Sequence, residues 1–160
     1  MKVISVLKLL LAVGVSFCAS FVGSAATFSG DSFSWYEALK KPIFTPPGWV
    51  FGPVWTILYL MMGIAAFLVW QKGGPKSHVR VALACFVVQL ILNAAWSVIF
   101  FGFHSAGWAL FDIILLWLAI IATVISFWRV DRVSAGLLLP YIVWVSFAVV
   151  LNAGIYLLNR

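Results

Sequence analysis

Five long apolar stretches constrain this chain more than any other feature of its sequence. They cover residues 3–26, 49–71, 79–103, 106–128 and 133–158. A transmembrane α-helix needs about 20 mainly apolar residues, and each stretch meets that length. Very short connectors follow the third and fourth stretches, and these force antiparallel neighbours. We therefore predict an all-α fold, an integral membrane bundle of five transmembrane helices, with residues 1–160 forming a single domain.

Composition and motifs exclude several other classes of protein. The chain is 65% hydrophobic and 9% charged, whereas an average soluble domain is about 45–50% apolar and about 25% charged. Lysine and arginine exceed acidic residues by 10 to 4, but they stand singly at the ends of apolar stretches, which argues against a nucleic-acid partner. Cys18 and Cys85 lie inside apolar stretches and are interpreted as packing residues. No common metal or cofactor motif is present, so we predict no metal and no obligatory cofactor.

The first apolar stretch has two interpretations. Its basic start and small residues near residue 26 are typical of a cleavable signal peptide. However, Ala12, Ser16, Ser20 and Ser24 recur every four residues, and such a stripe allows close helix packing in lipid. The stripe favours a retained helix, and cleavage stays the alternative.

The distribution of positive charge predicts the orientation. The N-terminus and the connectors after the second and fourth stretches share one side of the membrane, and the opposite side has fewer cations. The first side carries Lys2, Lys8, Lys72, Lys76, Arg80, Arg129 and Arg132, against Lys40, Lys41 and Arg160 on the other. The positive-inside rule then places the N-terminus in the cytoplasm, in a bacterial cell membrane or an equivalent organelle membrane.

The connector of residues 27–48, here called the lid loop, is the one long loop. Pro42, Pro46 and Pro47 fix the backbone repeatedly and exclude a helix over this part. A stiff loop with aromatic side chains can cover a pocket. It can also serve as an interfacial anchor, because Trp35, Tyr36 and Trp49 suit the headgroup region of a bilayer. The two interpretations are compatible.

Most deeply placed polar and indole side chains fall in the half of the membrane beneath the lid loop. At 1.5 Å per residue, several of them lie about 9–15 Å from the ends of their spans on that side. Helical spacing places them on three faces. These faces are Gln89, Asn93, Trp96, Ser97 and Phe100; Trp144, Ala148 and Asn152; and Trp55, Tyr59 and Met62. Aromatic walls with a few polar groups are typical of a small-molecule site. Hydrogen bonding between helices explains the asparagines equally well.

Two further features carry weaker hypotheses. Asp112 is a carboxylate inside a span, so it should face protein and form either a structural hydrogen bond or a ligand or proton contact. Leu151, Tyr156 and Arg160 fit a loose pattern proposed for sterol contact. An interfacial tyrosine and an arginine reaching toward water explain the same residues.

At the level of motifs, the chain resembles the TspO/MBR family, which comprises bacterial tryptophan-rich sensory proteins and the mitochondrial translocator protein. The match runs from about residue 35 to residue 159. It rests on Trp35-Tyr36, Lys41-Pro42, Pro46-Pro47-Gly48, Trp55-Thr56, Leu58-Tyr59, Asn93, Trp96, Phe100-Phe101, Asp112, Pro140-Tyr141, Trp144, Phe147-Ala148 and Leu151-Asn152. The resemblance implies a five-helix fold, a homodimer, and binding of protoporphyrin IX, haem precursors and, in some members, sterols. The implied ligand-binding residues are Tyr36, Pro46, Pro47, Trp55, Tyr59, Asn93, Trp96, Trp144, Ala148 and Asn152.

The resulting expectation is a membrane receptor or carrier for porphyrins and other hydrophobic ligands, with a role in tetrapyrrole or stress regulation. The alternative is an enzyme that degrades porphyrin under light, using Trp55 and Trp144 as its catalytic residues. No general base, nucleophile or metal cluster accompanies these tryptophans, which makes the enzyme less favoured. A third possibility is that the aromatic residues only pack the helices together.

Overall fold

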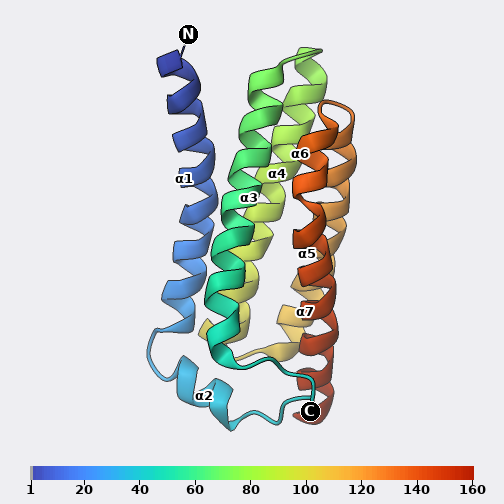
Figure 1. Ribbon diagram of the computed structural model, residues 1–160. Coiled ribbons are helices and arrows are strands. Elements are labelled where there is room, and N and C mark those ends of the chain that lie inside the picture. The colour runs from blue at the N-terminus through green and yellow to red at the C-terminus, as the bar shows by residue number, and fades with distance from the viewer. Residues whose placement is uncertain (1) are drawn as a thin grey trace.

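The computed structural model describes residues 2–160, and within that range it contains helices and no strand. Five segments are long and apolar enough to cross a membrane (Figure 1). They are Val3–Thr27, Gly48–Lys72, Lys76–Gly102, Ala106–Trp128 and Arg132–Leu158. The predicted all-α membrane bundle is therefore confirmed, and the predicted spans differ from the observed ones by a few residues at their ends.

Some spans are one continuous helix, and others consist of two consecutive helical segments. The elements along the chain are α1 (Lys2–Thr27), α2 (Ser32–Ala38), the 3₁₀ turn η1 (Gly48–Val50), α3 (Phe51–Lys72), α4 (Lys76–Ser97), the π-helical segment η2 (Val98–Gly102), α5 (Ala106–Trp128), α6 (Arg132–Leu137) and α7 (Leu139–Leu158). The last span is divided at Leu138. Pro140 has no N–H to donate to the backbone oxygen of Gly136, and its ring would clash with that oxygen in a continuous helix.

The helices form a closed bundle on most sides. α1 packs against α3 and α4, α4 packs against α5, and α5 packs against α6 and α7. α3 meets α6 at one end of the bundle, and a groove separates α3 from α7 further along. The N- and C-termini lie at opposite ends of the molecule, and α2 lies at the same end as the C-terminus (Figure 1).

The small-residue stripe of α1 faces the bundle for most of its length. Ala12 and Ser16 are buried, whereas Ser24 at the end of the stripe is exposed. On the opposing helix, a Cβ at Gly63 would lie 2.6 Å from the Cα of Val13, so only glycine permits this approach. These contacts give α1 a packing role in the bundle, and its retention in the mature protein stays a prediction.

The lid loop is attached to the bundle near its start and in its middle. At its start, the Ser32 hydroxyl donates to the backbone oxygen of Phe101 at 2.9 Å. Further along, the backbone of Lys40 donates to the Asn159 side chain at 3.0 Å and accepts from it at 2.8 Å. Pro42 packs so closely on Gly154 that a Cβ there would lie 2.5 Å from the proline ring. The loop is thus an ordered part of the fold.

Candidate functional site

A chain of buried hydrogen bonds joins α3, α4 and α7, and we call it the polar chain. The Tyr59 hydroxyl donates to Oδ1 of Asn93, whose Nδ2 donates to the Tyr141 hydroxyl at 3.0 Å. The Tyr141 hydroxyl in turn donates to Oε1 of Gln89 at 2.8 Å. All four residues are buried. The three helices that carry the predicted site therefore face one another.

Trp55 borders the polar chain from α3. Its ring centroid lies 5.5 Å from that of Tyr59 and 6.2 Å from that of Tyr141. Tyr141 was not among the predicted ligand-contacting residues. The sequence could have indicated Tyr141 as a site residue, because a tyrosine inside an apolar span needs a partner for its hydroxyl. Tyr141 also stands three residues before Trp144, on the same side of the helix.

A second pair of predicted residues bonds α4 to α7. Trp96 donates its indole N–H to Oδ1 of Asn152 at 2.9 Å, and Nδ2 of Asn152 donates to the backbone oxygen of Ala106 at 2.9 Å. The Trp96 ring also stacks on Phe100 at 5.2 Å. Asn93 and Asn152 thus hold helices together in this structure, and their contact with a ligand stays a prediction.

Tyr36 lies on the short helix α2, next to the end of the bundle that carries Phe100 and Phe101. Its ring lies edge-on to that of Phe100 at 6.2 Å and is tilted against that of Phe101 at 5.7 Å, and the Lys41 ammonium lies 4.5 Å from its centre. Burial, and secondarily the charge of Glu37, raises the pKa of the Tyr36 phenol, which therefore stays neutral. Tyr36 consequently fastens the lid loop to the bundle through aromatic contacts.

The remaining predicted residues from the lid loop and α7 contribute less directly. Pro46 is half-buried and Pro47 is exposed, immediately before η1. Beyond Pro42, the loop meets α7 through Phe44, whose ring lies 6.2 Å from that of Phe147. Ala148 is half-buried and packs against the core.

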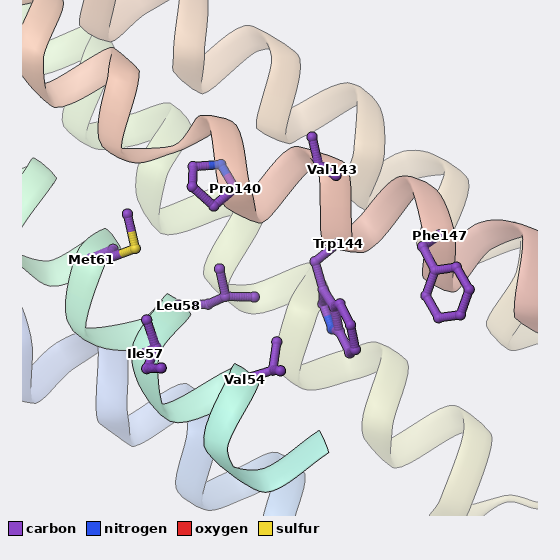
Figure 2. A pocket seen from close by; sticks show the side chains of 8 residues that line it. All are labelled: Val54, Ile57, Leu58, Met61, Pro140, Val143, Trp144 and Phe147. Carbon is purple, nitrogen blue, oxygen red and sulfur yellow. The ribbon is translucent and has the colours of Figure 1, made fainter. Parts of the chain in front are cut away.

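The open side of the bundle is an apolar groove of about 380 Å³ between α3 and α7. Figure 2 shows the α3 side chains facing those of α7, with Trp144 projecting toward α3. Val143 and Ile57 are 68% and 58% exposed, so the groove opens on the outer, lipid-facing surface. The groove is lined by Val54, Ile57, Leu58, Met61, Pro140, Val143, Trp144 and Phe147. Among the predicted ligand-contacting residues, Trp144 alone lines it.

Trp144 differs from Trp96 and Trp117 in its hydrogen bonding. Trp96 and Trp117 donate to side chains of α7, the latter to Ser146 at 2.8 Å. The indole nitrogen of Trp144 is buried and has no acceptor within the described part of the chain. Its ring contacts Phe51 at 5.9 Å and Phe147 at 5.6 Å. Trp144 thus contributes a buried, unpaired donor within the described range, on a residue that also lines the groove.

Asp112 lies buried on α5, and Oδ2 of its carboxylate has no hydrogen-bond partner among residues 2–160. The role of Asp112, as a structural hydrogen bond or as a ligand or proton contact, stays a prediction. The three residues of the sterol pattern do not form one surface. Leu151 is buried, Tyr156 is 39% exposed with its ring over Gly107, and Arg160 is exposed beyond the helix. No group of three potential metal ligands occurs in the described range.

Comparison with known proteins places the chain in a family. The model of the TspO/MBR family matches residues 10–158. The chain is 45% identical to the tryptophan-rich protein TspO of Chlorobaculum tepidum, over 96% of this chain and 97% of that protein. It is 44% identical to the human translocator protein, over 82% and 78% respectively, and 38% identical to the tryptophan-rich sensory protein of Cereibacter sphaeroides, over 78% and 77%. With its five spans, the chain is an integral, multi-pass membrane protein that belongs to the TspO/MBR family.

Proposed function

We propose that this chain is a membrane receptor or carrier for porphyrins, such as protoporphyrin IX and haem precursors, and for other hydrophobic ligands including sterols. We further propose a role in tetrapyrrole or stress regulation; the names of two relatives, a sensory protein and a translocator protein, fit a receptor or carrier. The observation that carries the proposal is the apolar groove between α3 and α7, with the unpartnered indole N–H of Trp144 beside it.

The chemistry of the groove suits a flat apolar molecule with an acceptor group. Aromatic rings of Phe51, Trp144 and Phe147 can stack against a macrocycle. An indole N–H in hydrocarbon cannot bond to water, so an acceptor on the ligand would satisfy an otherwise unpaired donor. A ligand that also reached Trp55, Tyr59, Asn93, Trp96 and Asn152 would have to displace hydrogen bonds that now hold helices together. We therefore expect Trp144 to make the first contact.

Binding can be measured from the absorbance band of protoporphyrin IX added to the purified protein in lipid nanodiscs. A Trp144→Phe variant keeps an aromatic ring but removes the donor, and we expect its affinity to fall about tenfold, since one unmet hydrogen bond is worth about 1–3 kcal/mol. Trp108→Phe is the control, because Trp108 is 70% exposed and does not line the groove. Equal affinities of the two variants would count against the proposal.

The alternative activity, light-dependent porphyrin degradation, has its own support. Trp55 contacts two tyrosines, whose phenol rings can also be oxidised. Trp144 lines the groove, where a bound porphyrin would lie next to it. Illumination of the protein with bound porphyrin would bleach the pigment faster than in the Trp55→Phe/Trp144→Phe variant. Bleaching at the same rate in both proteins would exclude a catalytic role of Trp55 and Trp144. A homodimer is also expected from the resemblance, and cross-linking in native membranes would test it.

A further inference from the structure

A surface hollow marks the end of α5 that lies away from the lid loop. Four residues of this helix end line a space of about 310 Å³, and we call it the α5 hollow: Val124, Ile125, Trp128 and Arg129. Ile125 is 51% and Trp128 is 55% exposed, so the hollow is on the outer face of the bundle. Because α5 leaves the membrane here, the hollow extends from the hydrocarbon region to the headgroup region.

Two arginines at the rim of the α5 hollow carry charges without acidic partners. Arg132 lies over the Trp128 ring, with its Cζ atom 5.4 Å from the ring centre. Neither Arg129 nor Arg132 forms an ion pair with any residue of the described range 2–160. Asp131 stands between them in sequence, but its carboxylate already binds the Lys72 ammonium and the Ser134 hydroxyl and backbone N–H. Two positive charges therefore remain unbalanced beside an apolar surface.

This combination matches the chemistry of a lipid with a negative headgroup. A guanidinium group recognises phosphate through two parallel hydrogen bonds. The aliphatic side chains of Val124 and Ile125 offer a surface for the upper part of an acyl chain, and an indole at this depth suits the membrane interface. A zwitterionic lipid would bring its own ammonium group toward the arginines and would be less favoured.

We propose that the α5 hollow binds one anionic phospholipid, with its phosphodiester at Arg129 and Arg132 and its acyl chain against Val124 and Ile125. This site is independent of the groove between α3 and α7, which shares no residue with it. It fits the basic side of the molecule, where Lys72, Lys76 and Arg80 are also placed. General attraction of those cations to a negative membrane surface is the competing explanation.

Native mass spectrometry in mild detergent distinguishes the two explanations. The full chain is incubated with phosphatidylglycerol or with phosphatidylcholine of identical acyl chains, and the retained lipid is counted. We expect one phosphatidylglycerol to be retained in preference to phosphatidylcholine. Arg129→Gln/Arg132→Gln should weaken its retention more than tenfold, given about fivefold per arginine. Both arginines are exposed, so the variant should fold normally, and its thermal midpoint verifies this.

The matched control removes the same charge from the same end of the molecule. Lys76 and Arg80 are exposed and do not line the α5 hollow, so Lys76→Gln/Arg80→Gln should retain the lipid like the unmodified chain. An equal loss in both double variants would overturn the proposal in favour of general charge attraction. Equal retention of the two lipids, or displacement of phosphatidylglycerol by soluble glycerol 3-phosphate at equal concentration, would overturn it as well.

Discussion

At the scale of single residues, each buried amide of the spans bonds to another helix. Asn93 on α4 bonds Tyr59 on α3 and Tyr141 on α7. Asn152 on α7 bonds Trp96 on α4 and the first residue of α5. Unpaired polar groups are costly in hydrocarbon, so these bonds select one rotation of each helix among several that would bury its apolar surface.

The bond between Trp96 and Asn152 can be tested by changing either partner. Asn152→Leu leaves the Trp96 N–H without its acceptor, and we expect a loss of about 1 kcal/mol in the free energy of unfolding. The measurement is unfolding in a denaturing detergent. Trp96→Phe removes the donor instead, and the double variant should lose less than the sum of the two single losses. Strictly additive losses would show that the bond contributes nothing.

The ion pair of Lys72 with Asp131 predicts a pH dependence of stability. Hydrogen bonds from Lys72, and then from Ser134, lower the pKa of the Asp131 carboxyl to about 2, against about 3.9 in an unfolded chain. The stabilisation is therefore complete above about pH 4 and is lost as the pH falls toward 2. Because Lys72 is 59% exposed, we expect only about 1 kcal/mol. Thermal midpoints should fall less steeply below pH 4 in Asp131→Asn; parallel pH profiles would contradict this.

At the scale of helices, glycine determines how closely neighbouring elements approach. α1 touches α3 where Gly63 faces the backbone of Val13. Gly63→Ala places a methyl group in that contact and should reduce stability by about 1–3 kcal/mol, because backbone atoms cannot give way. Gly52→Ala, on the same helix, meets no atom within 4 Å and should be neutral or slightly stabilising. Equal detergent stability of the two variants would refute close packing of α1.

The attachment of the lid loop depends on a second glycine. Gly154→Ala would collide with the ring of Pro42 and should detach the loop from α7 without unfolding the spans. We expect trypsin to cleave after the exposed Lys40 several times faster than in the unmodified chain, since proteases act on loops that open. Gly136→Ala, which meets no atom within 4 Å, is the control. Unchanged cleavage of the Gly154→Ala variant would mean that the loop is held by other contacts.

At the scale of the whole molecule, the two termini lie at opposite ends of the bundle (Figure 1), and five spans imply that they lie on opposite sides of a membrane. The excess of lysine and arginine beside the N-terminus predicts that this end is cytoplasmic. Alkaline phosphatase fused after Arg160 should then be active in the bacterial periplasm, whereas a fusion to the connector after Lys72 should be inactive. The reverse pattern would show that charge does not set the orientation of this chain.

The sequence by itself determined the five spans, the fold class and the ordered lid loop. These features depend on local properties: a span requires a certain length of apolar residues, and three prolines exclude a helix wherever they occur. The family resemblance was visible for the same reason, because its motifs are short and consecutive. Sequence spacing also placed Asn93, Trp96 and Asn152 in one half of the membrane, although it left their partners open.

Tertiary structure alone decided which polar groups meet. Tyr141 joins the polar chain, and Trp96 takes Asn152 as its acceptor. The indole N–H of Trp144 has no acceptor among residues 2–160, and Trp144 lines a groove that the remaining predicted ligand-binding residues do not line. Such pairings depend on the rotation of each helix and on the order of helices around the bundle. Both are fixed by the packing of all spans together, whereas the periodicity of one helix shows only which residues share a face.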